Sequence, residues 1–169
     1  PTTFTYTIRS DAKFWDGSPV TAEDVAYSGQ RIVDTAGAAP IAAGWASVKS
    51  VTASGNIVTV TLNQPDNGFA FRAALDWFVV QKDYSEAAGD DLGSPSKPGM
   101  GSGPYKVTSY SASEGATFDL TGTYWGEEPL VKQVKIVIIP DPETARLAMV
   151  QGDVDVYFDI PLIATRQYD

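Results

Sequence analysis

The chain has 169 residues, of which 12 are Lys or Arg, 21 are Asp or Glu and none is His or Cys, so its formal net charge is −9. The missing His and Cys exclude a Ser-His-Asp triad, a cysteine nucleophile, a disulfide and a thiolate or imidazole zinc site, and the acidic charge disfavours nucleic acid and membrane surfaces as partners. Hydrophobic residues make up 43% of the chain, which is typical of a chain that buries a core, and no apolar run approaches the ~18 residues that cross a bilayer.

The N-terminal part predicts a strand, a helix and a hairpin. Residues 3–8 alternate apolar side chains with threonine, the period of two that indicates a strand with one buried face. Thr21 is suited to cap a helix over residues 22–33, because an acidic residue stands at the third helical position and apolar residues recur at helical spacing. Two β-branched runs, 48–53 and 57–62, flank a Ser-Gly-Asn turn and predict a hairpin.

The middle of the chain is less regular. A loop at 64–68 precedes a short predicted helix at 69–75, and an apolar stretch at 76–80 follows it. Residues 89–103 are rich in Gly, Pro and Ser, which predicts a long irregular loop. Loops of this length in compact domains are often functional, and this loop is the one internal boundary that the sequence offers.

The C-terminal part predicts further strands and one helix. Residues 131–139 become apolar on both faces towards the end of the run, which is typical of a central strand. An Asp-Pro pair begins a helix at Pro142, and Gly152 is suited to end it. The other predicted strands are an antiparallel pair, 105–110 with 116–120, and a final strand at 154–158. Together these elements predict an α+β fold with mixed, largely antiparallel sheets and a few helices.

Motifs for catalysis and for metal binding fail on their context. Ser94 and Lys97 match the S-x-x-K pattern of serine acyl-enzymes, but a proline follows and no K-T-G motif is present. Asp153, Asp155 and Asp159 are spaced to approach a hard cation, yet the glycine and glutamate of an EF-hand loop are missing. We therefore predict no enzymatic activity, no metal and no cofactor. A carboxylate-based glycoside hydrolase stays open as an alternative, because the separation of two acids cannot be read from a sequence.

Six short motifs follow one another in an order that resembles a known family. They are TYTIR at 5–9, KFWDGSPVTAEDV at 13–25, GSGPY at 101–105, YWG at 124–126, IPDP at 139–142 and QGDVD at 151–155. Each motif alone is weak, but together they cover nearly the whole chain. The chain resembles the family 5 extracellular solute-binding proteins of bacterial ABC importers, a group of oligopeptide-, dipeptide- and nickel-binding receptors.

The resemblance implies a periplasmic-binding-protein-like fold of type II, cluster C, in which two lobes close over a solute. On this interpretation residues 1–169 are a fragment of lobe I, the second lobe and the signal peptide are absent from the chain, and 89–103 is a boundary inside the fragment. The ligand would be a peptide or another small molecule, delivered to ABC permease subunits. The parent would be a monomer in the periplasm, or a cell-surface lipoprotein in a Gram-positive bacterium, with no nucleic-acid partner.

The resemblance also directs the search for ligand-contacting residues to aromatic side chains at element ends. We expect the cleft surface near Trp45 and near Asp76, Trp77 and Phe78, with Phe158 as a further neighbour. Asp76 would orient an ammonium group and Trp77 would supply stacking area. Two alternatives stay open: both tryptophans are packing anchors of the core, or exposed tryptophans form a carbohydrate-binding surface module.

Overall fold

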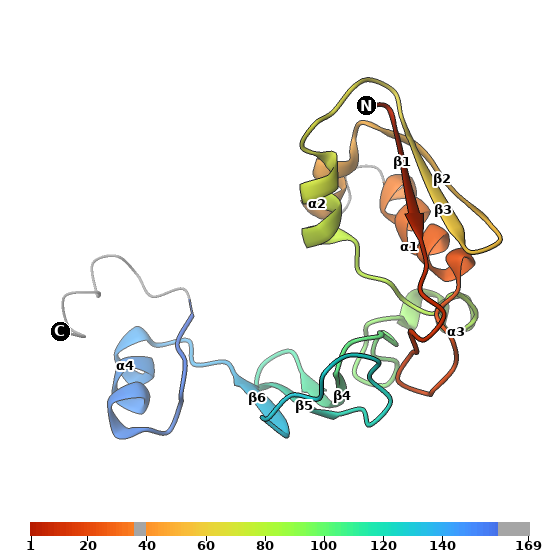
Figure 1. Ribbon diagram of the computed structural model, residues 1–169. Helices are drawn as coiled ribbons and strands as arrows, with labels where there is room; N and C mark the ends of the chain where they lie inside the picture. The colour runs from red at the N-terminus through yellow and green to blue at the C-terminus, as the bar shows by residue number, and fades with distance from the viewer. Residues whose placement is uncertain (36–39, 159–169) are drawn as a thin grey trace.

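The computed structural model describes residues 1–35 and 40–158. It contains two three-stranded antiparallel sheets, with strand orders β1-β3-β2 and β4-β5-β6, one before and one after the segment 92–104 (Figure 1). The strands are β1 (Thr3–Thr7), β2 (Val48–Ser54), β3 (Ile57–Leu62), β4 (Tyr105–Ser111), β5 (Gly115–Leu120) and β6 (Gln133–Val137). The helices are α1 (Ala22–Asp34), α2 (Phe69–Asp76), α3 (Lys82–Ala88) and α4 (Pro142–Gln151), with 3-10 helices η1 (Pro40–Trp45) and η2 (Gly89–Asp91). The predicted α+β class with antiparallel sheets is confirmed.

Helix α1 begins as its sequence predicts. The Thr21 hydroxyl accepts a hydrogen bond from the Asp24 amide at 3.2 Å, and the Asp24 carboxylate accepts one from the Thr21 amide at 2.9 Å. This reciprocal pair is a capping box, which satisfies two backbone N–H groups that the first helical turn would otherwise leave without partners. The pair therefore sets the first residue of α1.

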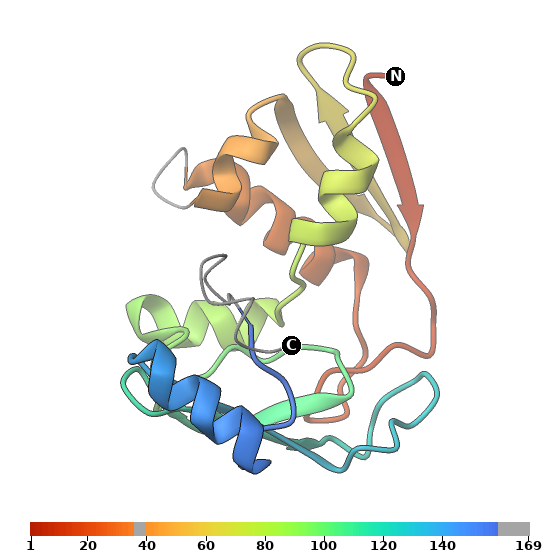
Figure 2. The same cartoon turned by 90° about the vertical axis from the view of Figure 1, so that its left-hand side faces the viewer.

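The core of the N-terminal half lies between the first sheet and the helices α1, η1 and α2, which cover one face of the sheet (Figures 1 and 2). Val58 and Val60 of β3 are fully buried, while the alternate residues Ile57, Thr59 and Thr61 are more exposed, as a strand with one covered face requires. Trp45 and Phe69 fill the space under the helices, with ring centroids 5.4 Å apart. The period of two in β1 and β3 thus places one face of the sheet in the core.

The turn after β1 joins the two halves of the chain. Trp15 donates its backbone N–H to the Gly101 carbonyl at 3.1 Å, and the Thr123 hydroxyl donates to the Phe14 carbonyl at 3.3 Å. The Arg9 guanidinium carbon lies 4.0 Å from the centroid of the Trp125 ring, a cation–π contact. The TYTIR, KFWDGSPVTAEDV, GSGPY and YWG motifs, far apart in the sequence, therefore meet at this junction.

The predicted central strand at 131–139 is wrong in position and length. β6 covers only Gln133–Val137 and lies at an edge of the second sheet, paired with β5 alone. Val134, Ile136 and Val137 are 36%, 51% and 48% exposed. The apolar side chains at the end of this run are suited to burial on both faces of a strand. Among the described residues, however, no element covers either face of β6.

The predicted strand at 154–158 is also wrong. These residues form no strand, and Val156 and Phe158 are 63% and 77% exposed. A strand needs a neighbouring strand to take its backbone hydrogen bonds, and alternation in the sequence does not supply that neighbour. Helix α3 was not predicted from the sequence. The segment 89–103 was predicted to be a loop throughout, whereas it begins with η2.

Candidate functional site

The structure separates the three consecutive residues that were predicted to contact ligand. Asp76 ends α2, and Phe78 donates its backbone N–H to the Asp76 carbonyl at 3.0 Å, around Trp77 with φ −84° and ψ 79°. These values define an inverse γ-turn, a tight reversal of the chain. The turn sends Trp77 inward, whereas Phe78 is 72% exposed.

Trp77 packs against the core with its indole ring. Its Nε1 donates to the Val25 carbonyl at 3.1 Å, and its ring meets the rings of Trp45 and Tyr6 edge-on, with centroids 5.2 Å and 5.5 Å apart. Trp45 itself is only 1% exposed. These positions favour the packing alternative for both tryptophans, and Trp45 has no surface left for a ligand.

The exposed face of α2 carries an apolar stripe that the sequence analysis missed. Phe71 and Leu75 are 70% and 58% exposed and lie one helical turn apart. The stripe, called the α2 stripe below, consists of Ala70, Phe71, Ala74, Leu75 and Phe78, all exposed. The helical spacing of these apolar residues is visible in the sequence, but the same spacing is also expected of a helix that faces the core. A contiguous exposed apolar surface of this kind marks an interaction site.

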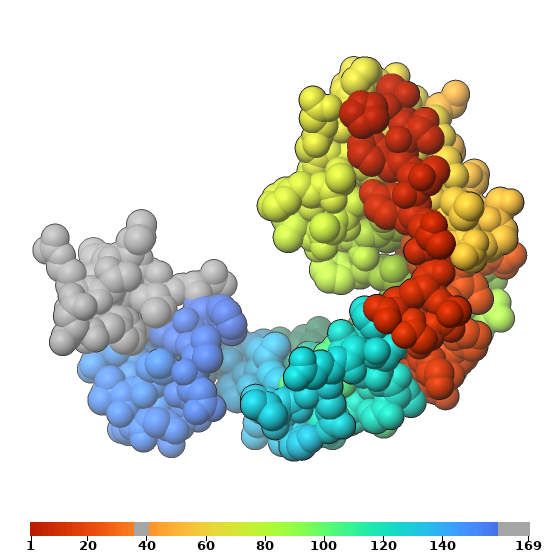
Figure 3. All heavy atoms as spheres, viewed as in Figure 1, coloured from red at the N-terminus to blue at the C-terminus, as the bar shows by residue number. Residues whose placement is uncertain are grey.

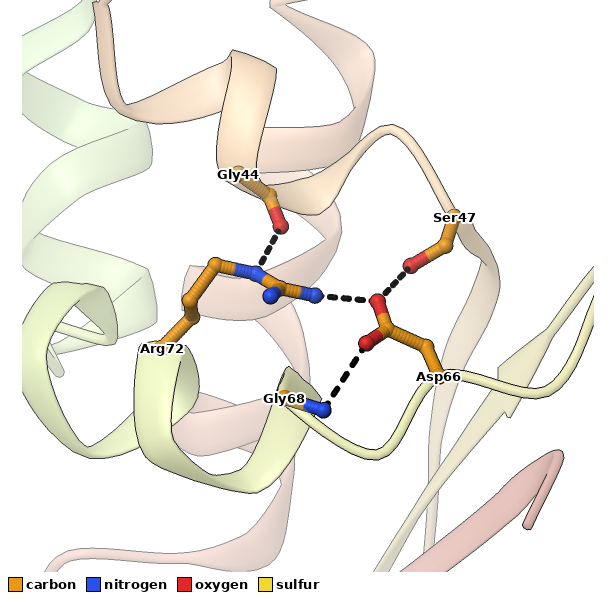
Figure 4. Close-up of polar contacts among 5 residues, drawn as sticks. All are labelled: Gly44, Ser47, Asp66, Gly68 and Arg72. Carbon is orange, nitrogen blue, oxygen red and sulfur yellow. Dashed lines mark hydrogen bonds and ion pairs between the residues drawn. The ribbon is translucent and has the colours of Figure 1, made fainter.

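A polar cluster fixes α2 against η1 and the beginning of β2 (Figure 4). The Arg72 guanidinium donates from Nε to the Gly44 carbonyl at 2.9 Å and forms an ion pair with Asp66. Asp66 also accepts hydrogen bonds from the Ser47 hydroxyl and the Gly68 amide, each at 3.0 Å. One carboxylate thus collects three donors from three segments, which sets the position of α2.

The electrostatics of this cluster favour the charged form of Asp66. Partial burial of the carboxylate would by itself raise its pKa. The hydrogen bonds from Ser47 and Gly68 and the charge of Arg72 outweigh that effect and hold the pKa of Asp66 below its ordinary value of 3.8. Asp66 is therefore ionised at neutral pH and serves as a structural anchor of α2.

Asp76 supplies a carboxylate at the C-terminal end of α2. It is half-buried, and its Oδ2 lies beside Gly44 of η1, where a Cβ would be 3.4 Å away. The carboxylate therefore lies on the side of α2 that faces η1, whereas the stripe lies on the exposed side. The stripe by itself suits the apolar part of a ligand.

Phe158 lies on a different part of the molecule from Asp76 and Phe78. It follows α4, and α4 is separated from α2 in both ribbon views (Figures 1 and 2). In the space-filling view α2 lies on the side of the N-terminal half that faces an open hollow, and α4 lies across that hollow (Figure 3). The structure does not bring Phe158 together with the other predicted residues.

Other candidate sites in the described residues are less suited to binding a ligand or a metal ion. A cavity of about 250 Å³ between the N-terminal ends of α1 and α3 is lined by polar residues, including Asp24 and Lys82. Asp24 uses one oxygen in the capping box and the other to accept the Lys82 amide at 2.9 Å, so it is occupied structurally. Within residues 1–35 and 40–158 no three acidic side chains gather as a metal site would require. Asp159, one of the acids considered from the sequence, lies outside the described residues.

Comparison with known sequences gives a consistent result. A profile of the bacterial extracellular solute-binding proteins, family 5, middle region, matches residues 1–169. The chain is 31% identical over 164 residues to a probable D,D-dipeptide-binding periplasmic protein, DdpA, of Escherichia coli (strain K12), covering 94% of this chain and 31% of that protein. It is 30% identical over 166 residues to a probable peptide-binding protein, YejA, of Agrobacterium fabrum, covering 89% of this chain and 26% of that protein.

Comparison with solved structures agrees. The unliganded open form of MppA, a periplasmic murein tripeptide binding protein, matches with a TM-score of 0.84 at 26% sequence identity, covering 98% of this chain and 36% of that one. The chain therefore spans between 26% and 36% of the length of these relatives. Among the residues that the structure describes, no helix combines the length and apolar character needed to cross a membrane.

Proposed function

Because the chain belongs to the bacterial extracellular solute-binding proteins of family 5, we propose that it forms one wall of the solute cleft in the receptor of an ABC importer. The receptor captures its solute outside the cytoplasm and delivers it to permease subunits in the membrane. The fragment belongs to lobe I, and a second lobe closes over the solute from the other side of the cleft. Such a hinge motion needs no nucleophile, cofactor or resident metal ion.

The α2 stripe with Asp76 is the observation that carries the proposal at the level of the site. Phe71, Leu75 and Phe78 form an exposed apolar surface, and Asp76 ends α2 with its carboxylate beside Gly44. A short peptide with an apolar side chain fits this surface, and an ammonium group that reaches the C-terminal end of α2 would meet Asp76. The three relatives named above are called dipeptide-, peptide- and murein tripeptide-binding proteins, which supports a peptide as the solute.

The structure disfavours the two alternative functions. A carbohydrate-binding surface needs an exposed tryptophan face, but Trp45 is 1% exposed and Trp15, Trp77 and Trp125 are each partly buried. A glycosidase needs one carboxyl whose pKa is raised so that it can act as the acid. Six acids of the described residues have a lowered pKa instead, which makes each of them unsuited to that role: Asp11, Asp16, Asp66, Asp119, Asp141 and Glu143.

A ligand screen tests the proposal directly. A full-length protein that carries this chain is heated with panels of short peptides and of oligosaccharides, because a ligand that binds only the folded state raises the melting temperature. We expect stabilisation by peptides. Stabilisation by oligosaccharides alone would establish the carbohydrate alternative, and no stabilisation by either panel would refute the proposed function.

Two aromatic substitutions test the site itself. Phe78→Ala removes an exposed ring and is expected to lower peptide affinity about tenfold in calorimetry while leaving the melting temperature nearly unchanged. Trp45→Ala, the buried counterpart, is expected to cost ~3–5 kcal/mol of unfolding free energy. Wild-type affinity in a folded Phe78→Ala variant would remove Phe78 from the site.

A further inference from the structure

One face of α1 lies against the segment that follows α2. The residues of this face are Asp24, Val25, Ser28 and Gly29, which are spaced one, three and one positions apart and are all buried. Side chains at i and i+4 of a helix lie above one another, so these four residues form a single short row. The segment 77–82 runs along this row.

Hydrogen bonds attach the segment to the row at three points. The Trp77 indole donates to the Val25 carbonyl at 3.1 Å, the Val80 amide donates to the Ser28 hydroxyl at 3.0 Å, and the Lys82 amide donates to the Asp24 carboxylate at 2.9 Å. Asp24 uses one carboxylate oxygen in the capping box and the other for Lys82, and Ser28 accepts from Val80 with its hydroxyl oxygen. Here they satisfy backbone groups of a segment that has no regular secondary structure before α3.

Gly29 provides the space in which the indole ring rests. A Cβ built on Gly29 would lie 2.9 Å from both Cε2 and Cζ2 of Trp77, closer than carbon atoms can approach. Edge-on contacts with Trp45 and Tyr6 also hold the ring in this position. Glycine is less favourable than alanine in the middle of a helix, so its presence at position 29 reflects the packing of the ring.

We propose that Gly29 is a positioning residue for the solute site. By admitting the Trp77 indole against α1, it holds the γ-turn that directs Phe78 outward at the end of the α2 stripe. Gly29 touches no solute; it acts through Trp77. This inference rests on the proposed function, since it assigns a role to a residue behind the same site.

The test compares the effect of Gly29→Ala in two backgrounds, the wild-type protein and a Trp77→Phe variant, whose smaller ring leaves room for the new methyl group. Each full-length protein is measured for hydrogen exchange of the Val80 and Lys82 amides and for affinity towards a peptide selected in the screen. Gly103→Ala is the matched control, because a Cβ there meets nothing within 4 Å. Ser28→Ala removes a bond to Val80 without adding volume and serves as a second route to the same effect.

We expect Gly29→Ala to speed the exchange of both amides and to weaken peptide binding about tenfold in the wild-type background. In the Trp77→Phe background, Gly29→Ala should change neither the amide exchange nor the peptide affinity. A merely structural cost in α1 would instead appear in both backgrounds. Ser28→Ala should speed the exchange of Val80 and weaken binding, and Gly103→Ala should do neither.

Three results would overturn the inference: unchanged exchange and affinity in Gly29→Ala, faster exchange with unchanged affinity, or losses of equal size in both backgrounds. If Gly29→Ala fails to fold, Ser28→Ala decides in its place, because unchanged affinity together with faster exchange would separate the segment from the site. A wild-type protein that binds no peptide would refute the proposed function instead, and with it any role of Gly29 in positioning a peptide site.

Discussion

At the scale of single residues, the direction in which a side chain points decides its role more than its position along the chain does. Asp76, Trp77 and Phe78 are consecutive, yet around the γ-turn Trp77 packs against the core and Phe78 is 72% exposed. The anchor of Trp77 is the carbonyl of Val25, 52 positions earlier in the chain. A stretch of three residues can therefore contain both a core anchor and a contact surface.

Asp66 yields a prediction at this scale, because its carboxylate holds Arg72 and with it α2. Its pKa is below 3.8 in the folded state, so its ionised form stabilises the fold above the unfolded value of 3.8, and that stabilisation is lost as the pH falls through the folded value. Asp66→Asn should lower the urea midpoint of unfolding at pH 7. The difference from wild type should shrink as the pH falls below 3.8.

A charge control separates this effect from the change in net charge. Asp90→Asn removes the same charge from an exposed position in η2 and should leave the midpoint near that of wild type. If Asp66→Asn showed the same loss of stability at every pH, the lost charge would not be the cause, and the amide would simply pack less well than the carboxylate.

At the scale of helices and strands, a capping side chain decides where a helix begins, and the neighbouring segments decide which of its faces is buried. α1 and α4 both begin at a residue whose side chain accepts a hydrogen bond from the helix, Thr21 for α1 and Asp141 for α4. Their faces differ: α1 buries six residues, whereas α4 buries Ala145 alone. α4 thus begins where its sequence predicts and still has little to pack against among the described residues.

The cap of α1 gives a second prediction. Thr21→Ala removes the hydroxyl that accepts from Asp24 and should reduce the unfolding free energy by about 1 kcal/mol, measured by urea denaturation. Thr21→Ser keeps the hydroxyl and is the control, with stability close to wild type. Equal losses in both variants would show that the methyl group of Thr21, not its hydrogen bond, stabilises α1.

At the scale of the whole molecule, the turn after β1 connects the two halves through its contacts with Gly101, Thr123 and Trp125. Beyond that junction the second sheet and α4 expose large apolar side chains, among them Ile136 at 51% and Val150 at 67%. Relatives are about three times longer than this chain, since it spans 31% of DdpA and 36% of MppA. These apolar faces suit coverage by further polypeptide, which also supports a cleft that needs a second wall.

The isolated chain should bind a peptide only weakly. A single wall leaves most of a bound peptide in water, so residues 1–169 alone should bind a peptide far more weakly than a full-length receptor does. Calorimetry of both proteins with the same peptide measures the difference. Sub-micromolar affinity for the isolated chain would show that the site is complete without a second lobe.

Local information in the sequence determined the helix α1 with its cap, the hairpin of β2 and β3, the antiparallel class of the sheets and the family. These features depend on residues that are close together in the chain or on short motifs in order. The sequence pattern also marked 131–139 as apolar on both faces towards the end of the run, whereas within β6 Gln133 and Lys135 alternate with Val134 and Ile136.

Only the tertiary structure decided which apolar side chains are covered. Trp45 and Phe78 are both large aromatic residues next to helices, but one is 1% and the other 72% exposed, because the rings of Phe69 and Trp77 close over Trp45. The same holds for β6 and for 154–158, whose patterns predict buried strands although no neighbour covers them among the described residues. Burial is a property of pairs of segments, and the partners in each pair stand tens of residues apart, beyond the reach of local periodicity.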